Sequence, residues 1–349
     1  MDKMESTLLV GSARPGGLGG MYRLQAGGAG WQQLGGGLPE KLQVNCVVQR
    51  PNTPSEVFIG THSGLFHSTD GGDSWTELGL AKEYTAIYSI LLHPTDPDTI
   101  YAGMDGTVIH KTEDGGATWR KLPAVQPEGA ITGCFPVRVL RMVADPANPE
   151  EVYAALEVGG AIRSLDGGAT WEDISQGLLD LSTQPHLRNH ILSDDDTEGM
   201  MDVHAVAVSA EQPGKVWAAN RMGLFVSEDK GKTWEEFGIG RFSDLTYGRD
   251  LMVSPHDSTV FLAALSDSSR GVKGSLYRSA DAGATWNRLD HDVTIESTLM
   301  TVSADPSDPG RVVCASRLGQ VFGTEDGGAT WRSCPLPDGV EDVRAVVAV

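Results

Sequence analysis

The stretch that decides the fold is His67–Leu78, "HSTDGGDSWTEL", whose middle reads Ser/Thr-x-Asp-x-Gly-x-Ser/Thr-Trp. The same spacing, here named the turn motif, recurs at Thr112–Trp119, Ser164–Trp171, Ser227–Trp234, Ser279–Trp286 and Thr324–Trp331. A seventh segment, "LQAGGAGW" at Leu24–Trp31, keeps the Gly and the Trp but has Ala26 in place of the Asp. Self-similarity at a regular period indicates a repeat architecture.

The residue types of the turn motif fit a tight hairpin turn. An Asp carboxylate accepts hydrogen bonds from backbone N–H groups of its own turn, and Gly adopts the positive φ that such a turn demands. The Trp buries a large face between strands. The motif is therefore expected to be structural, and a catalytic role for Asp70 and its counterparts is disfavoured.

Each copy lies in a similar four-strand unit, for example "VNCVVQ", "VFIGT", "GLFHS" and "SWTEL" around the first motif. The chain starts with only three such strands, "TLLVGS", "MYRLQ" and "WQQL", and ends with one left over, "DVRAVVAV". We expect the last strand to complete the first unit, because closure leaves no long sheet edge exposed. The prediction is an all-β, seven-bladed β-propeller formed by residues 1–349 as one domain.

The motif resembles the Asp-box, or BNR, repeat, and the resemblance extends over almost the whole chain. Among proteins with this repeat, the chain most resembles the cytosolic bacterial proteins labelled BNR-repeat glycosyl hydrolase-like. Sialidases of this kind are six-bladed and carry an R-I-P signature that is missing here, so sialidase activity is not expected. Xyloglucanase-type enzymes cleave between two seven-bladed domains with paired carboxylates, and a single ring lacks that cleft. Seven-bladed photosystem assembly factors are similar in size and bear an arginine patch.

Charge and composition exclude several function classes. A formal net charge of −20 disfavours nucleic acid as a partner, since such binding rests on clustered cations. No run approaches the about 18 apolar residues of a membrane span, and the first residues do not resemble a secretory signal. A cytoplasmic protein without a membrane partner is expected. The four cysteines show no C-x-x-C pairing, which predicts reduced thiols.

The two faces of the predicted ring differ in the length of their loops. Turns between first and second strands, such as "HPTDPDT", are short, and the turn motifs should lie on that same side, where chemistry is not expected. The other side carries two long links, within residues 120–140 and 172–204, and a longer turn, "SDSSRGVKGS". Long loops in a compact fold are usually functional, so a walled mouth is predicted there.

Polar residues gather at this predicted mouth. Counting from each motif Trp places Asn45, Tyr88, Leu140, His204, Arg249, Met300 and Arg344 at equivalent positions early in the inner strands. The candidate ligand-binding residues are Arg249, Arg344, Arg138, Arg141, Tyr88, Asn45, His62, Glu157, Arg221, Arg317, His186, Arg188 and His190. Because Arg presents a fork suited to carboxylate or phosphate, a small anionic ligand is predicted. Ion pairing of these arginines between blades is the alternative.

Catalysis at the mouth would fall to His204, with Asp202 or Asp250 holding its imidazole. A divalent metal near His186, His190 and His204 is conceivable but not favoured, because the segment reads as a solvated loop. The resulting expectation is a small-molecule-binding propeller, an enzyme of hydrolase or lyase type acting on an anionic substrate. The alternative is a non-catalytic propeller that docks a protein partner through the same face.

Overall fold

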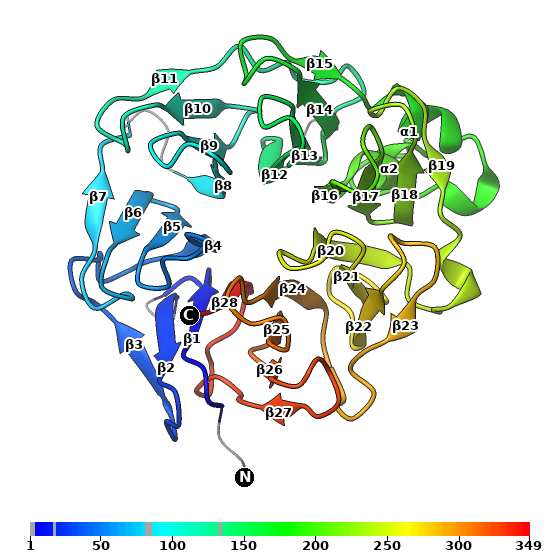
Figure 1. Cartoon of the computed structure of the whole chain (residues 1–349). Coiled ribbons are helices and arrows are strands. Elements are labelled where there is room, and N and C mark those ends of the chain that lie inside the picture. The colour runs from blue at the N-terminus through cyan, green and yellow to red at the C-terminus, as the bar shows by residue number, and fades with distance from the viewer. Residues whose placement is uncertain (1–3, 17–18, 81–85, 132–134) are drawn as a thin grey trace.

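The computed structural model describes residues 4–16, 19–80, 86–131 and 135–349, and these form seven four-stranded antiparallel sheets. Figure 1 shows the sheets as the blades of a ring, each with one strand at the centre and three progressively further out. The predicted seven-bladed β-propeller is confirmed.

The strands follow chain order from the centre outward in every blade except the first. The first blade contains β28 (Val343–Ala348), β1 (Leu8–Ser12), β2 (Gly20–Leu24) and β3 (Trp31–Leu34). The next three blades contain β4 (Val44–Gln49), β5 (Val57–Thr61), β6 (Gly64–Ser68), β7 (Thr76–Leu78), β8 (Ile87–Leu92), β9 (Ile100–Met104), β10 (Ile109–Thr112), β11 (Arg120–Lys121), β12 (Arg138–Ala144), β13 (Val152–Glu157), β14 (Gly160–Ser164) and β15 (Glu172–Asp173). The last three contain β16 (Val203–Val208), β17 (Val216–Asn220), β18 (Gly223–Ser227), β19 (Glu235–Glu236), β20 (Tyr247–Val253), β21 (Phe261–Ser266), β22 (Gly274–Ser279), β23 (Asn287–Arg288), β24 (Leu299–Ala304), β25 (Val312–Ser316), β26 (Val321–Thr324) and β27 (Arg332–Ser333).

Closure of the ring is the pairing of β28 with β1. Leu8 lies opposite Ala348 and Val10 opposite Val346. Apolar side chains of both strands enter one buried cluster between the first and last blades. The leftover C-terminal strand therefore completes the blade that the N-terminal strands begin, as predicted.

The turn motif forms the same hydrogen-bonded turn in its six full copies. In the first copy Ser68 Oγ accepts a hydrogen bond from the backbone N–H of Gly72 at 2.8 Å and donates one to Asp70. The Asp70 carboxylate accepts hydrogen bonds from the backbone N–H and the hydroxyl of Ser74, at 2.9 and 2.5 Å. Trp75 is buried between blades. The side chains of Ser68 and Asp70 thus form hydrogen bonds within their own turn.

The motif turns and the turns between first and second strands lie on one face, here called the turn face. In each of the six copies a backbone N–H of the motif donates to a carbonyl of the neighbouring turn, as Gly71 does to Ser55 at 2.9 Å and Gly167 to Glu150 at 2.8 Å. The opposite face, called the loop face, carries the long links. The predicted assignment of these turns to one side is therefore correct.

The link between β15 and β16 contains short helices that the sequence did not predict. These are α1 (Gln176–Leu181), the 3-10 helix η1 (Pro185–Leu187) and α2 (Glu198–Met201), and a further 3-10 helix, η2 (Ile239–Arg241), follows β19. The buried carboxylate of Glu198 accepts hydrogen bonds from the backbone of Leu192 and Ser193, which folds the link onto itself. Within the described ranges no helix has the length and apolar character needed to cross a membrane.

Candidate functional site

A β-bulge occurs at the same place in each of the seven inner strands. In β4, for example, Val44 pairs with Thr61 and Cys46 with Gly60, so Asn45 has no opposite residue. The skipped residues, here called the bulge ring, are Asn45, Tyr88, Leu140, His204, Arg249, Met300 and Arg344. They are the residues that counting from the motif Trp placed at equivalent positions. A bulge re-aims side chains, and here it is repeated around the whole ring.

All seven bulge-ring residues, together with Arg141, line one cavity of about 40 Å³ at the loop-face end of the central channel. The long links and the β21–β22 turn contribute no residue to this cavity among the described residues. The mouth is therefore smaller than the loop lengths suggested. It is walled by the inner strands, and the long loops do not enclose it.

Arginine dominates the charge of the bulge ring. Arg249 Nη1 lies 3.8 Å from Glu157 Oε1, which is an ion pair but not a hydrogen bond. Arg344 makes no hydrogen bond or ion pair with any described residue, and burial together with the neighbouring Arg249 lowers the pKa of its guanidinium. Two cations thus face one small cavity, and one of them lacks a carboxylate partner.

The guanidinium of Arg138 has closer carboxylate partners than that of Arg249. Arg138 Nη1 donates to Glu157 Oε2 at 3.0 Å, and its Nε lies 3.5 Å from Asp105. The Arg138 guanidinium also stacks over the Tyr88 ring at 5.0 Å. Burial raises the pKa of Asp105. Arg138 and Glu157 belong to one blade, whereas the contact with Asp105 joins two blades and fits the alternative of ion pairing between blades.

His204 is buried and both of its ring nitrogens are engaged. Nδ1 lies 2.7 Å from the carbonyl oxygen of Gly248, to which it donates, and Nε2 lies 3.2 Å from Asp202 and 3.3 Å from the hydroxyl of Tyr247. Asp202 is also bound by Arg221 Nε at 3.0 Å. Although burial alone would raise it, the pKa of Asp202 is lowered by His204, Arg221 and Arg249. The Asp202 carboxylate therefore stays ionised and holds the imidazole, one of the two predicted roles.

Asp250 does not hold His204, and that part of the expectation is wrong. Its buried carboxylate is bound by the Arg141 guanidinium and accepts a hydrogen bond from the backbone N–H of Val302 at 3.0 Å. Arg141 belongs to β12 and Asp250 to β20, so the pair bridges across the intervening β16. In β16 the equivalent position holds the small Ala205, which pairs with Ala219 as Arg141 pairs with Ala155 and Asp250 with Ala264.

The three long-link candidates lie apart from His204. His186 is exposed and pairs with Glu236 at 2.8 Å, while His190 and Arg188 pair with Asp196 at 2.6 and 3.4 Å. Of these two acidic partners, Asp196 lies in the link itself and Glu236 in β19. The predicted part of the three candidates in ligand binding or in a metal site with His204 is therefore not supported by their positions.

A different group, Glu157, Asp202 and His204, places three potential ligand atoms within 4.8 Å of one another. Both carboxylates are already bound by arginines, Glu157 by Arg138 and Asp202 by Arg221. A divalent cation would have to enter among these guanidinium groups, so the arrangement disfavours a metal.

The remaining candidates contact their own surroundings. His62 Nδ1 accepts from the backbone N–H of Gln43 at 3.1 Å, and Asn45 donates to the carbonyl of Ile87 in the next blade. Arg317 pairs with Asp342 at 3.7 Å. Sequence reasoning missed Tyr247 and Asp342, although each lies two residues before a predicted arginine.

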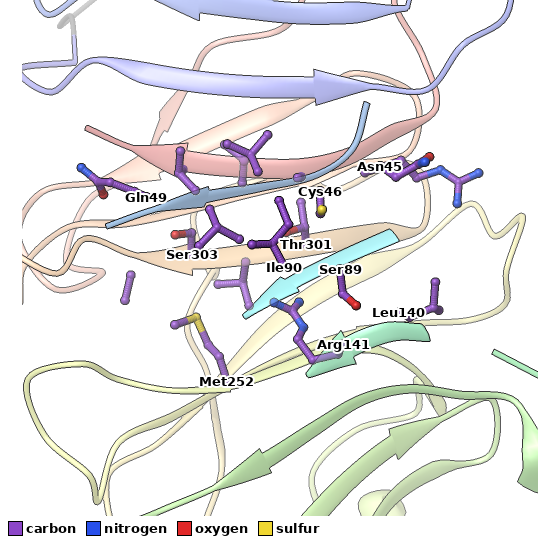
Figure 2. A pocket seen from close by; sticks show the side chains of 18 of the residues that line it. Asn45, Cys46, Gln49, Ser89, Ile90, Leu140, Arg141, Met252, Thr301 and Ser303 are labelled. Atoms are coloured by element: carbon purple, nitrogen blue, oxygen red, sulfur yellow. The ribbon is translucent and has the colours of Figure 1, made fainter. Parts of the chain in front are cut away.

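Three larger cavities extend toward the turn face, where no chemistry was expected. They measure about 290, 480 and 440 Å³ and extend along the inner strands to turn-face prolines such as Pro51 and Pro255. The first of them also reaches four bulge-ring residues, Asn45, Tyr88, Leu140 and Arg344. Figure 2 shows the first of them, with Asn45 at one end, Gln49 at the other and Arg141 pointing into the space between.

Two curated proteins are similar to this chain in sequence. A xyloglucanase of Hypocrea jecorina is 25% identical over 327 residues, covering 82% of this chain and 38% of that protein. Xyloglucanase Xgh74A of Acetivibrio thermocellus is 27% identical over 235 residues, covering 56% of this chain and 26% of that protein. The chain thus spans well under half the length of these curated relatives.

Two solved structures illustrate the likeness of the fold. The GH74 xyloglucanase of Xanthomonas campestris superposes with a TM-score of 0.62 at 17% identity, covering 92% of this chain and 46% of that one. YCF48 bound to D1 peptide superposes with a TM-score of 0.55 at 18% identity, covering 90% and 92%. The family model for the DUF6242 β-propeller domain matches residues 19–236. The chain belongs to the DUF6242 β-propeller domain family.

Proposed function

We propose that the chain is a ligand-binding propeller that holds a small anionic group, a carboxylate or a phosphate, in the bulge ring. The observation that carries this is the pair Arg249 and Arg344, of which Arg344 has no hydrogen bond or ion pair among the described residues. A half-buried guanidinium without a partner is costly unless an anion completes it. The cavity of about 40 Å³ fits an anionic group of that size but not a whole sugar.

We further propose that ligand binding, and not hydrolysis, is the main function of the chain. The curated relatives are named xyloglucanases, so a hydrolase-like role is the natural second candidate. A general acid or base needs a ring nitrogen or carboxylate that can exchange a proton with the ligand. Both nitrogens of His204 are engaged and Asp202 remains ionised, which leaves Asp105, whose pKa burial raises, as the carboxyl group best suited to hold a proton.

A protein partner at the loop face is a further candidate. Among the described residues, four of the five exposed large apolar side chains, Val125, Leu192, Val272 and Leu318, belong to loop-face segments. The single-ring neighbour whose structure contains a bound peptide is matched over nearly its whole length. We also propose that the chain is related to Asp-box proteins, which the hydrogen bonding of the turn motif supports. A cytoplasmic location is a further proposal.

Calorimetric titration of phosphate and of acetate tests the main proposal. We expect saturable binding to the wild type and at least about tenfold weaker binding to Arg344→Met, since a charge-assisted hydrogen bond contributes about 1.5–3 kcal/mol. Arg120→Met, which removes an exposed guanidinium on β11, is the matched control and should bind like the wild type. Equal affinity of wild type and Arg344→Met, or no binding to either, would show that the mouth is not an anion site.

A further inference from the structure

The turn-face half of the channel is a cup with mostly apolar walls. We define this channel cup by Val48, Ile90, Val253, Ser303 and Val347 on its walls and by rim prolines, namely Pro51, Pro255 and Pro306. The cavities along it reach about 480 Å³, the size range of small-molecule sites. The mouth cavity beyond Arg141 is about a tenth of that size.

Arg141 stands at the base of the cup. It lines the mouth cavity and all three larger cavities, and its side chain is 40% exposed. One Nη group is bound by Asp250, while Nε has no hydrogen-bond partner and the other Nη makes no hydrogen bond with any described residue. Figure 2 shows the guanidinium pointing into the cavity among Ser89, Ile90 and Met252. Because Nε is itself buried, the Nη group that Asp250 does not bind is the donor available to a ligand.

We propose that the channel cup binds a small monocarboxylate with an apolar body, aromatic or branched aliphatic, whose carboxylate meets Arg141. The apolar body would lie against Val48, Ile90 and Val253, where its burial is favourable. The Nη group of Arg141 that Asp250 does not bind can donate to one oxygen of the ligand's carboxylate. The cup adjoins the bulge ring, because Asn45, Tyr88, Leu140 and Arg344 line its first cavity as well. It differs from the bulge-ring site in its apolar walls and in using Arg141 as the partner of the carboxylate.

Charge balance favours a single negative charge on the ligand. Asp250 already neutralises part of the Arg141 charge, and it is buried with no way to move into water. At Arg141 a doubly charged phosphate would therefore keep an uncompensated charge against the apolar walls, which is unfavourable. Arg344, at the bulge-ring end of the same cavity, is the cation better suited to it. Hydroxyl groups of Thr301 and Ser303 also line the cup and can bind the second carboxylate oxygen.

Titration of benzoate, with benzyl alcohol as its neutral isostere, tests the class of ligand. We expect benzoate to bind the wild type at least about tenfold more tightly than benzyl alcohol does, the difference being the interaction with Arg141. The double variant Arg141→Met/Asp250→Asn removes both charges together and so leaves no buried carboxylate without its partner. It should bind benzoate at least tenfold more weakly, whereas Arg120→Met should be unchanged. Equal binding of the two ligands, or of benzoate to the double variant, would overturn the proposal.

Two further measurements locate the ligand. Ser303→Trp places a large ring in the cup without touching Arg141, so it should abolish benzoate binding even if the double variant fails to fold. A crystal soaked with 4-bromobenzoate should show its anomalous bromine peak beside Val48 and Val253 on the turn-face side of Arg141. A peak inside the bulge ring, or benzoate affinity retained by Ser303→Trp, would contradict a site in the cup.

Discussion

The two faces of the propeller use repetition in opposite ways. On the turn face, six turns repeat the same residues, and each Asp carboxylate is satisfied within its own turn. On the loop face, seven bulges repeat the same backbone geometry with different side chains, among them a His, a Tyr and two Arg. Repetition of residues indicates a structural role, while repetition of geometry with varied residues indicates a site.

The largest effect we expect concerns the strand that both faces depend on. Removing Glu341–Val349 should abolish cooperative unfolding, because the apolar side chains of β28, buried between the first and last blades, are lost. Burial of each large aliphatic side chain contributes about 1.5–3 kcal/mol, so the loss is comparable to the whole stability of a domain. Thermal denaturation followed by circular dichroism measures it. Deleting Val349 alone is the control, and an unchanged melting temperature in the longer truncation would show that β28 does not close the ring.

A smaller loss is expected from one turn motif. Ser164→Ala leaves the buried backbone N–H of Gly168 without its acceptor, which should cost about 1–3 kcal/mol in the free energy of unfolding. Urea denaturation gives that value, and calorimetry on the folded variant should give wild-type phosphate affinity because the motif lies on the opposite face. Weaker phosphate binding by the folded variant would contradict the assignment of the turn motif and the anion site to opposite faces.

The turn motifs should also make the protein sensitive to acid. Hydrogen bonds from the side chain and backbone of Thr118 lower the pKa of Asp114 from 3.8 to about 2, and the five other motif carboxylates are lowered for the same reason. A pKa that is lower in the folded state contributes stability above the unfolded value, and this is lost as pH falls. The urea midpoint should therefore decline between about pH 4 and pH 2. A variant with Asp114→Asn and Asp326→Asn should decline less steeply, and an equal slope would contradict this origin.

The smallest effect on stability is expected at the bulge ring. Arg344→Met removes a cation that has no partner among the described residues and lies near Arg249. The free energy of unfolding should stay within about 0.5 kcal/mol of the wild type or rise slightly, since a like-charge contact is relieved. Urea denaturation without ligand measures it. A loss as large as that of Ser164→Ala would mean that Arg344 is structural and that the ring is not a prepared site.

The period of the turn motif was sufficient to predict the blades, the closing strand and the seven equivalent positions now seen as bulges. These follow from spacing along the chain, which a repeat holds constant. The contact between Arg141 and Asp250 could not be predicted, because it joins blades that are not neighbours along the ring. The sizes of the cavities could not be predicted from the sequence either. Loop length predicted a walled mouth, yet the long link folds onto its own Glu198 and leaves the mouth to the inner strands.

The pairing of β28 with β1 also sets an order of events during synthesis. Of the described strands, β1 to β3 leave the ribosome before the rest, and β28, which belongs at the centre of their blade, leaves last. The inner edge of β1 therefore stays exposed while the other blades are made, and an exposed strand edge invites pairing with another chain. Cells that make this protein quickly would hold many such incomplete rings at once, so its yield should depend on the rate of translation and on chaperones that cover the waiting edge.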